Sequence, residues 1–312
     1  MKSKRVVAVG LLYNDHVRRV LDRAPTAVDH LSIVPDVLQV DHVRHGRRSA
    51  RGRFADVEIV ADVVLELARD FPMVGHGVGL SIGSPRALDR GYVNRMRSWV
   101  ERLRLLWYSE HLSFFRLRRG STAAHDAGLA CPLPCDRAVQ VAVARRAAAV
   151  QAALGVPFLL ENGVSYVAPV DDDMCEPEFL NGLCAGANTG LLLDLHNLYV
   201  NSRNLGVDAA AALEALDAAT VREIHIAGGD DLLGYYTDAH SGSTPEPVWA
   251  LLRRVLPRLE QLQAITFEYH QSVGERIGVE GVLEQLARAR EELAGAGIGS
   301  GAPQRVETSH VA

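Results

Sequence analysis

The stretch GLLLDLHN (190–197) combines a buried-strand pattern with a polar end. Its three consecutive leucines indicate a strand inside the protein, yet Asp194, His196 and Asn197 follow without a break. Burying a carboxylate without a partner costs several kcal/mol, so such residues are normally kept out of the interior. The stretch therefore predicts a strand whose end meets a partner for an acid, an imidazole and an amide.

The rest of the chain repeats this alternation of short apolar runs and longer amphipathic segments. Amphipathic segments carry apolar residues three and four positions apart, which indicates helices, and four of them are 56–70, 93–106, 136–155 and 278–295. The apolar runs, which indicate strands, are 6–12, 30–36, 73–81, 107–114, 157–163, 190–197, 221–229 and 264–270.

Strands that alternate with helices predict an α/β fold with a parallel sheet covered by helices. Eight such units predict a single-domain (β/α)8 (TIM) barrel over residues 1–293. An open doubly wound sheet is the competing architecture, but it usually has a glycine-rich phosphate turn after its first strand, and AVGLLYND (8–15) contains none. The small and polar tail 294–312 is expected to be disordered.

Composition narrows the class of protein. The net charge of −5 gives no sign of the strongly basic field that nucleic-acid or membrane binding would favour. Apolar runs stay well short of the roughly 18 residues of a membrane-spanning helix. Four cysteines (Cys131, Cys135, Cys175 and Cys184) fit reduced thiols better than a disulfide framework. We expect a soluble cytoplasmic protein that binds neither nucleic acid nor a membrane.

Two connections are long. The segment 41–55 is rich in arginine, and 115–135 follows the fourth predicted strand. The basic segment is either a solvated connection or a docking surface for an acidic peptide or partner.

Polar and mostly ionisable residues gather at the ends of six consecutive predicted strands, the rim where barrel enzymes build their sites. Each residue alone could be a hydrogen-bonded or salt-bridged rim residue. Together, so many carboxylates would repel one another unless cations lay between them, and acid–base catalysis would need only two. The residues are His76, Glu110, His111, Glu161, Asn162, Asp194, His196, Asn197, His225, Glu268 and His270, with Asp238 and His240 in the loop after the seventh strand.

The ligand types restrict the metal. Imidazole and carboxylate without thiolate favour iron, zinc or manganese. Because the candidates outnumber the ligands of one ion, we expect two or three ions with a bridging carboxylate. The stretch CPLPC (131–135) lacks a second cysteine pair and does not predict a separate zinc site.

Several motifs stand in a recognisable order: HGVGLSIG (76–83), SEHLSF (109–114), LLENGVSY (159–166), GLLLDLHNLYVNSRN (190–204), EIHIAGG (223–229), TDAHS (237–241), PVWALL (247–252) and FEYH (267–270). Over residues 73–290 the chain resembles the multinuclear non-haem iron-dependent oxidative enzymes. That family includes the enzyme that makes the oxazolone and thioamide groups of methanobactin. The resemblance implies a TIM barrel of the xylose-isomerase-like superfamily, in agreement with the eight predicted strands.

The resemblance also implies ten metal ligands at three iron positions. They are His76, His111 and Glu161 for the first iron; Glu161 as a bridge, with Asp194, His225 and Glu268, for the second; and Asp238 and His240, with Asn197 or His196, for the third. Glu110, on the opposite strand face from His111, is expected to support or pack.

The family chemistry implied is O2 activation by mixed-valence Fe(II)/Fe(III), directed at a residue of a ribosomally made precursor peptide, most often cysteine. A small partner protein often binds the leader of that peptide. One departure is LSIVPDVL (31–38), where only Asp36 matches an acidic position of the family's second strand. We expect the substrate-facing wall to differ there.

Other functions fit the same residue types. An endonuclease IV-like zinc phosphodiesterase or a divalent-metal sugar isomerase would also place His, Asp and Glu at these strand ends. A nuclease would need basic residues around the mouth of the barrel, whereas here GGDDLLGYYTDAH (228–240) is acidic. A metal-storing or peptide-binding barrel without catalysis is the non-enzymatic alternative.

Overall fold

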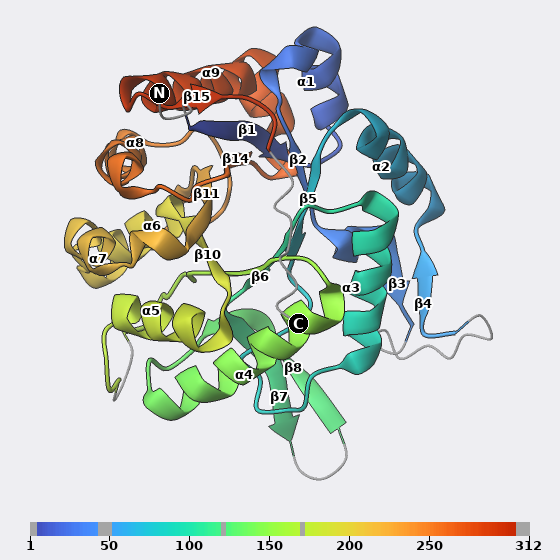
Figure 1. The fold of residues 1–312 in the computed structure, drawn as a ribbon, viewed down its shortest axis with the longest axis vertical. Helices are drawn as coiled ribbons and strands as arrows, with labels where there is room; N and C mark the ends of the chain where they lie inside the picture. The colour runs from blue at the N-terminus through green and yellow to red at the C-terminus, as the bar shows by residue number, and fades with distance from the viewer. Residues whose placement is uncertain (1–4, 43–51, 120–122, 169–171, 304–312) are drawn as a thin grey trace.

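The computed structural model describes residues 5–42, 52–119, 123–168 and 172–303, and its central feature is a closed ring of eight parallel strands (Figure 1). The order around the ring is β14-β11-β10-β9-β6-β5-β2-β1, with β1 pairing to β14. Each strand falls within one of the predicted apolar runs, so the predicted (β/α)8 barrel is confirmed. The strands are β1 (Val6–Leu12), β2 (Leu31–Ile33), β5 (Met73–Gly77), β6 (Tyr108–His111), β9 (Phe158–Glu161), β10 (Gly190–Asp194), β11 (Val221–Ala227) and β14 (Ala264–Glu268).

The ring closes between the first and last of these strands. Strand β1 pairs in parallel with β14 from Ala8 opposite Ala264 to Leu11 opposite Phe267. Because every neighbouring pair is parallel, the carboxyl ends of all eight strands meet at one rim.

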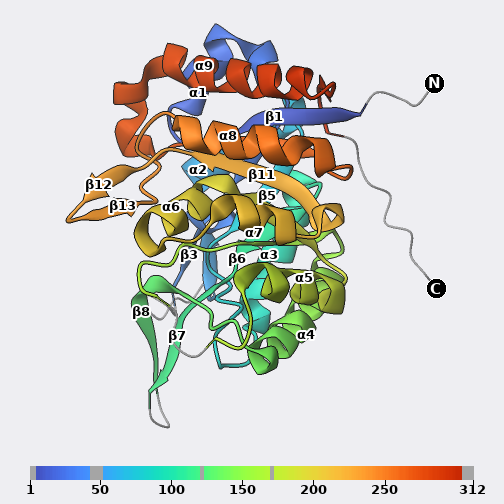
Figure 2. The same ribbon diagram turned by 90° about the vertical axis from the view of Figure 1, so that its left-hand side faces the viewer.

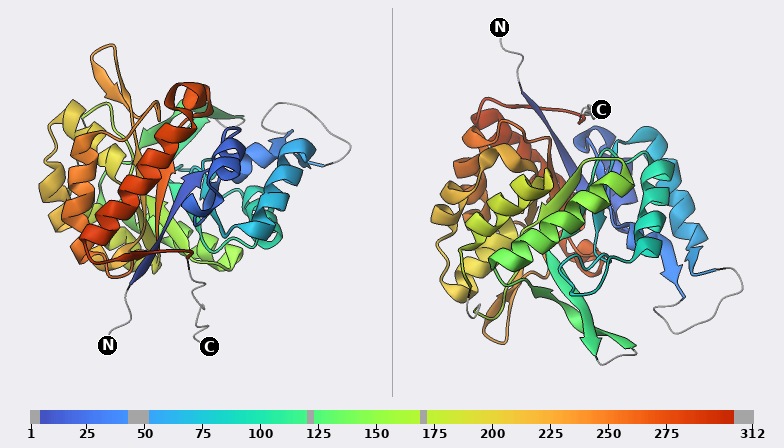
Figure 3. Two further views of the ribbon diagram at one scale, coloured as in Figure 1. Left: turned by 90° about the horizontal axis from the view of Figure 1, so that it is seen from above. Right: turned by 60° about the horizontal axis from the view of Figure 1, so that its bottom comes forward.

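Helices cover the outside of the ring (Figures 1 and 3). Helix α4 shows how the sequence sets their ends: Asp136 accepts the backbone N–H of Val139 at 2.8 Å, and Gly155 ends the helix in the left-handed region at φ 74°. The four predicted helices are α2 (Glu58–Asp70), α3 (Arg90–Leu103), α4 (Arg137–Leu154) and α9 (Gly274–Gly295). The others are α1 (Val17–Arg23), α5 (Glu176–Ala187), α6 (Leu195–Leu205), α7 (Ala209–Ala215) and α8 (Glu246–Val255).

The predicted run 190–197 is not a single strand. Strand β10 ends at Asp194 and α6 begins at Leu195, so His196 and Asn197 lie in the first turn of a helix. The reason is local: Asp194 accepts the backbone N–H of Asn197 at 2.7 Å, the N-cap interaction that starts a helix.

Among the described residues, three antiparallel hairpins lie outside the ring. Most of the long connection 115–135 belongs to one of them, in which residues 113–119 pair with residues 123–132. Of the basic segment 41–55, the ends belong to the β3–β4 hairpin, and residues 43–51 lie outside the described residues. In Figure 2 the β7–β8 and β12–β13 hairpins project on the same side, away from the start of β1. The hairpins are β3 (Gln39–Asp41) with β4 (Phe54–Asp56), β7 (Ser113–Arg119) with β8 (Ala123–Pro132), and β12 (Asp230–Leu232) with β13 (Tyr235–Thr237).

A short strand follows the last helix and lies beside the ring. Strand β15 (Gly299–Ser300) pairs in parallel with β1 at Val6 and Val7. Secondary structure therefore continues past the boundary predicted at residue 293, and residues 304–312 lie outside the described part of the chain. None of the described helices combines the length and apolar character that crossing a membrane would need.

Candidate metal centre

The rim brings all ten predicted ligands into one connected cluster. Strands β5, β6, β9, β10, β11 and β14 each present at least one of them, α6 adds two, and the loop after β13 adds two more. Most are buried; His111 keeps 35% of its side chain exposed and is the most accessible of the histidines that face Glu161. Whether these residues bind metal stays a prediction.

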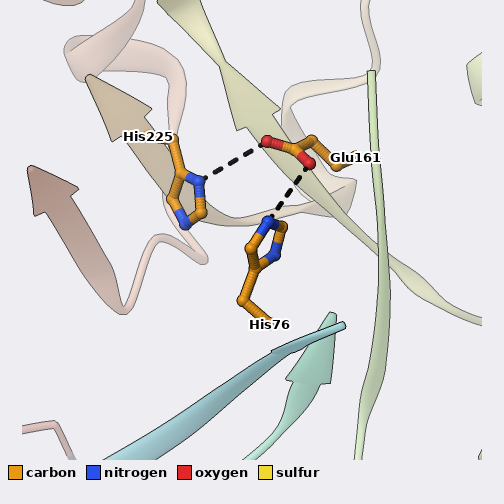
Figure 4. Close-up of side chains that lie close together, drawn as sticks. All are labelled: His76, Glu161 and His225. Carbon is orange, nitrogen blue, oxygen red and sulfur yellow. Dashed lines mark ion pairs between the residues drawn. The ribbon is translucent and has the colours of Figure 1, made fainter. Parts of the chain in front are cut away.

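Glu161 lies between histidines from different strands (Figure 4). Its Oε2 atom is 3.6 Å from Nε2 of His76 and 3.2 Å from Nε2 of His111. Its Oε1 atom is 3.5 Å from Nδ1 of His225. The two carboxylate oxygens therefore face two different sets of imidazole nitrogens, as a bridging ligand would.

Hydrogen bonds on the far side of His76 and His111 determine which nitrogen carries the proton. Ser109 Oγ donates to the carbonyl of Gly75 at 3.0 Å, so it accepts the Nδ1–H of His76 at 2.9 Å. The carbonyl of Gly77 can only accept, and it takes the Nδ1–H of His111 at 3.1 Å. Both Nε2 atoms are thus left with a lone pair directed at Glu161.

His225 follows the same rule with its nitrogens exchanged. Its Nε2 lies 3.2 Å from Oε1 of Glu223 and donates to that carboxylate. Burial raises the pKa of Glu223, but the hydrogen bond and positive charge of His225 bring the pKa below its ordinary value. Nδ1 of His225 lies 3.2 Å from Oε1 of Glu268. Burial lowers the pKa of His225, but Glu268, Glu161 and Glu223 outweigh it and raise the pKa well above its ordinary value.

The Nε2 lone pairs of His76 and His111 face Oε2 of Glu161 across 3.6 and 3.2 Å, and such lone pairs repel unless a cation lies between them. Buried atoms of the cluster that make no hydrogen bond within the described residues are Glu161 Oε2, Asp194 Oδ2, Asn197 Oδ1, His225 Nδ1, His240 Nε2 and Glu268 Oε1. Oxygen and imidazole donors of this kind suit iron, zinc or manganese, so the residues present fit the expected metal.

Two sets of three ligand atoms converge to within 4.8 Å of one another. The first set is His76, Glu161 and His225, and the second is Asp194, His240 and Glu268. They differ from the expected grouping, which placed His225 with Asp194 and His240 with Asp238.

Burial and mutual charge set the protonation of the cluster. Burial lowers the pKa of His76 to about 4, so this imidazole is neutral and its lone pair is available. Burial, reinforced by Glu161, raises the pKa of Asp194 well above its ordinary value. Burial lowers the pKa of His240, but Asp238 and Glu268 outweigh it and raise the pKa to about 10. Protons here occupy positions that metal cations would take over on binding.

The alternative of His196 or Asn197 as a ligand can be compared directly. His196 Nδ1 lies 2.9 Å from Asp238 Oδ1 and its Nε2 lies 3.4 Å from the hydroxyl of Tyr236, so both nitrogens have partners. Asn197 donates from Nδ2 to the carbonyl of Asn162 at 3.0 Å and leaves its buried Oδ1 without a hydrogen bond among the described residues. The geometry favours Asn197 as the available ligand.

Glu110 and His270 stay outside the cluster. Glu110 Oε1 accepts the backbone N–H of Leu80 at 3.2 Å, and burial raises its pKa well above the ordinary value, with Asp36 adding to the effect. His270 is exposed and its Nδ1 accepts the backbone N–H of Ser272. Glu110 thus packs away from the cluster, as expected.

The residues that hydrogen-bond to the imidazoles on their far side were not predicted from the sequence. Among these, Glu223 contacts His225, Ser109 contacts His76, and Tyr236 contacts His196. For Glu223 a signal existed: it lies two residues before His225 in β11, and alternate residues of a strand share a face.

The chain is similar to a family of known proteins. Residues 9–291 match the family described as RiPP precursor modification enzyme MbnB/TglH/ChrH. A UPF0276 protein from Anaeromyxobacter sp. (strain Fw109-5) is 35% identical over 243 residues, which cover 78% of this chain and 82% of that protein. A UPF0276 protein from Chromobacterium violaceum is 39% identical over 193 residues, 62% of this chain and 68% of the relative.

Solved structures share the fold at low sequence identity. The D-psicose 3-epimerase of Clostridium cellulolyticum H10 superimposes with a TM-score of 0.54 at 12% identity, covering 93% of this chain and 98% of the enzyme. The IOLI protein with a bound zinc atom gives a TM-score of 0.53 at 12% identity, with 93% and 98% covered. At such identity the likeness concerns the barrel alone.

Proposed function

This chain belongs to the family of RiPP precursor modification enzymes (enzymes acting on ribosomally synthesised and post-translationally modified peptides), and from that membership we propose an iron-dependent oxidative modification of a precursor peptide with O2. The residue modified is most often cysteine in the family that the motifs resemble. We place the reaction in the cytoplasm, where free thiols such as Cys135 and Cys184 persist.

One observation carries the proposal: three imidazole nitrogens, from His76, His111 and His225, point at the carboxylate of Glu161. This arrangement is unfavourable without cations and matches a carboxylate that bridges two ions. A sugar isomerase or a phosphodiesterase would need the same kind of cations, so the family, and not the ligand set alone, favours peptide oxidation.

Nine residues would hold the metal: His76, His111, Glu161, Asp194, Asn197, His225, Asp238, His240 and Glu268. The two sets whose ligand atoms converge, His76 with Glu161 and His225, and Asp194 with His240 and Glu268, would each hold one ion, and the remaining residues would complete the coordination. When bound, mixed-valence iron would supply O2 activation and would hold a substrate thiolate.

The protein's own residues perform the remaining tasks. Ser109, the carbonyl of Gly77 and Glu223 orient the three imidazoles. Deep burial of Glu161 and His225 excludes water from the middle of the cluster, and the partly exposed His111 marks the side open to a substrate. A peptide docked at this side would be positioned by the rim before any bond changes.

We also propose that a small partner protein delivers the peptide by binding its leader. The basic segment considered for this contact in the sequence lies mostly at residues 43–51, outside the described residues.

The test starts with purification in the absence of oxygen from cells grown with ample iron. Elemental analysis is expected to find two or three irons per chain, and a cysteine-containing precursor peptide is expected to stimulate O2 uptake with a mass change in the peptide. Zinc retained in place of iron under these conditions would contradict the proposal and would direct the search to sugars and phosphodiesters.

A further inference from the structure

A buried carboxylate lies one layer deeper in the barrel than the metal cluster. Glu223 is 0% exposed, and each of its oxygens has a donor. Oε1 is 2.7 Å from the hydroxyl of Thr266 and 3.2 Å from Nε2 of His225, and Oε2 is 2.7 Å from Nε1 of Trp107. These donors come from three different parts of the ring, so the carboxylate is fixed in position.

The contacts also fix His225. Because an ionised carboxylate only accepts, the Nε2 proton of His225 stays on the side of Glu223, and Nδ1 faces the cluster. Thr266 in turn contacts the ring of His30 at 2.9 Å, which ties the carboxylate into a buried polar layer beneath the rim.

The three imidazoles that face Glu161 therefore differ in what stands behind them. His76 has a neutral hydroxyl, His111 has a neutral carbonyl, and His225 has an ionised carboxylate. A carboxylate behind a metal-binding imidazole makes the imidazole a more basic ligand and commonly changes metal affinity by about 10–100-fold. The cluster is thus electrostatically uneven, with more negative charge on the His225 side.

We propose that Glu223 is a positioning residue that orients His225 and that, when iron is bound, would stabilise Fe(III) over Fe(II) at the ion that His225 holds. The assignment of charge rests on the proposed function, whereas the positioning of His225 requires only that the cluster binds a divalent metal.

The test compares isosteric changes at two buried carboxyl groups. Glu223→Gln removes the negative charge behind His225, and Glu110→Gln is the matched control because Glu110 is equally buried but faces away from the cluster. Ferrous-iron affinity is measured by anaerobic competition with a chelator, and the Fe(III)/Fe(II) midpoint potential by redox titration followed spectroscopically.

For Glu223→Gln we expect a loss of affinity of about 10–100-fold at one ion and a more positive midpoint potential, because less negative charge remains to stabilise Fe(III). For Glu110→Gln we expect the same iron affinity and the same midpoint potential as in the parent protein. Parental affinity and potential in Glu223→Gln, or equal changes in the two variants, would overturn the proposal.

A second variant keeps the test decisive if Glu223→Gln does not fold. Thr266→Val removes one donor from Glu223 Oε1, so the carboxylate interacts more strongly with His225. The midpoint potential is then expected to become more negative, and an unchanged or more positive potential would count against Glu223.

Metal identity separates a failure of the proposed function from a failure of the positioning role. A parent protein that binds zinc or cobalt but no iron would refute the proposed function and the charge assignment. In that case cobalt affinity decides the positioning role: a selective fall in Glu223→Gln supports it, and equal affinities in Glu223→Gln and Glu110→Gln refute it.

Discussion

The carboxylate of Asp194 accepts the backbone N–H of Asn197 at 2.7 Å, so a single side chain both ends β10 and begins α6. This bond uses Oδ1, while Oδ2 is buried and makes no hydrogen bond within the described residues. Oδ1 therefore caps the helix, and Oδ2 is available to bind a metal ion in the cluster.

This division of labour predicts different effects for two substitutions of Asp194. Asn caps helices as well as Asp, so Asp194→Asn is expected to keep the melting temperature and to lose metal. Asp194→Ala should lose both metal and about 1 kcal/mol of stability from the cap. Thermal denaturation of the metal-free variants and elemental analysis check this. Full metal content in Asp194→Asn would show that the charge of Asp194 is not needed.

Glu161→Gln is expected to release at least two ions together, because its two oxygens face different imidazoles. The measurement is the number of irons per chain after anaerobic desalting. His16→Gln, a change at a partly exposed histidine that faces Glu275, serves as the control. Loss of one ion alone from Glu161→Gln would rule out the bridge.

The choice between Asn197 and His196 can be made by isosteric change. Asn197→Leu removes the unbonded oxygen and is expected to lose one ion, together with about 1 kcal/mol from the hydrogen bond to Asn162. His196→Gln can still donate to Asp238 and is expected to keep that ion with weaker affinity. The reverse pattern of metal content would identify His196 as the ligand.

Glu110 predicts a pH dependence of stability. Burial, with Asp36, raises its pKa in the folded state well above the model-peptide value of 4.5. The folded chain therefore holds a proton that the unfolded chain releases above pH 4.5, and this contribution to stability falls as pH rises, by at most about 1.4 kcal/mol per pH unit.

The amide of Glu110→Gln resembles the protonated carboxyl group but does not titrate. The variant should therefore lose the pH dependence of stability that Glu110 causes. In metal-free protein, the stability of the variant relative to the parent is expected to rise between pH 5 and pH 8, as measured by urea denaturation. A difference that does not change with pH would mean that Glu110 titrates normally.

The barrel could be predicted from the sequence because each buried strand is an apolar run and each outer helix has an apolar stripe. The ends of the elements were harder to predict. The change from strand to helix after Asp194 depends on one side-chain hydrogen bond, and the β7–β8 hairpin depends on backbone pairing that composition does not reveal.

The candidate site was predictable to a similar extent. Residues at strand ends must meet at one rim, and the residues named from the sequence lie together there; that they bind metal stays a prediction. Their grouping could not, because whether His225 lies nearer to His76 or to Asp194 depends on the stagger of neighbouring strands. Glu223 was not predicted because it lies below the rim, and only residues at the strand ends were expected to belong to the site.

The closing of β14 against β1 also has a consequence for how the protein is made. The candidate ligands run from His76 to Glu268, and the last of them ends the strand that completes the ring. A nascent chain on the ribosome holds only part of the cluster until that strand has emerged and paired with the first. Iron is therefore expected to bind only after the ring has closed, so iron uptake would indicate that folding is complete.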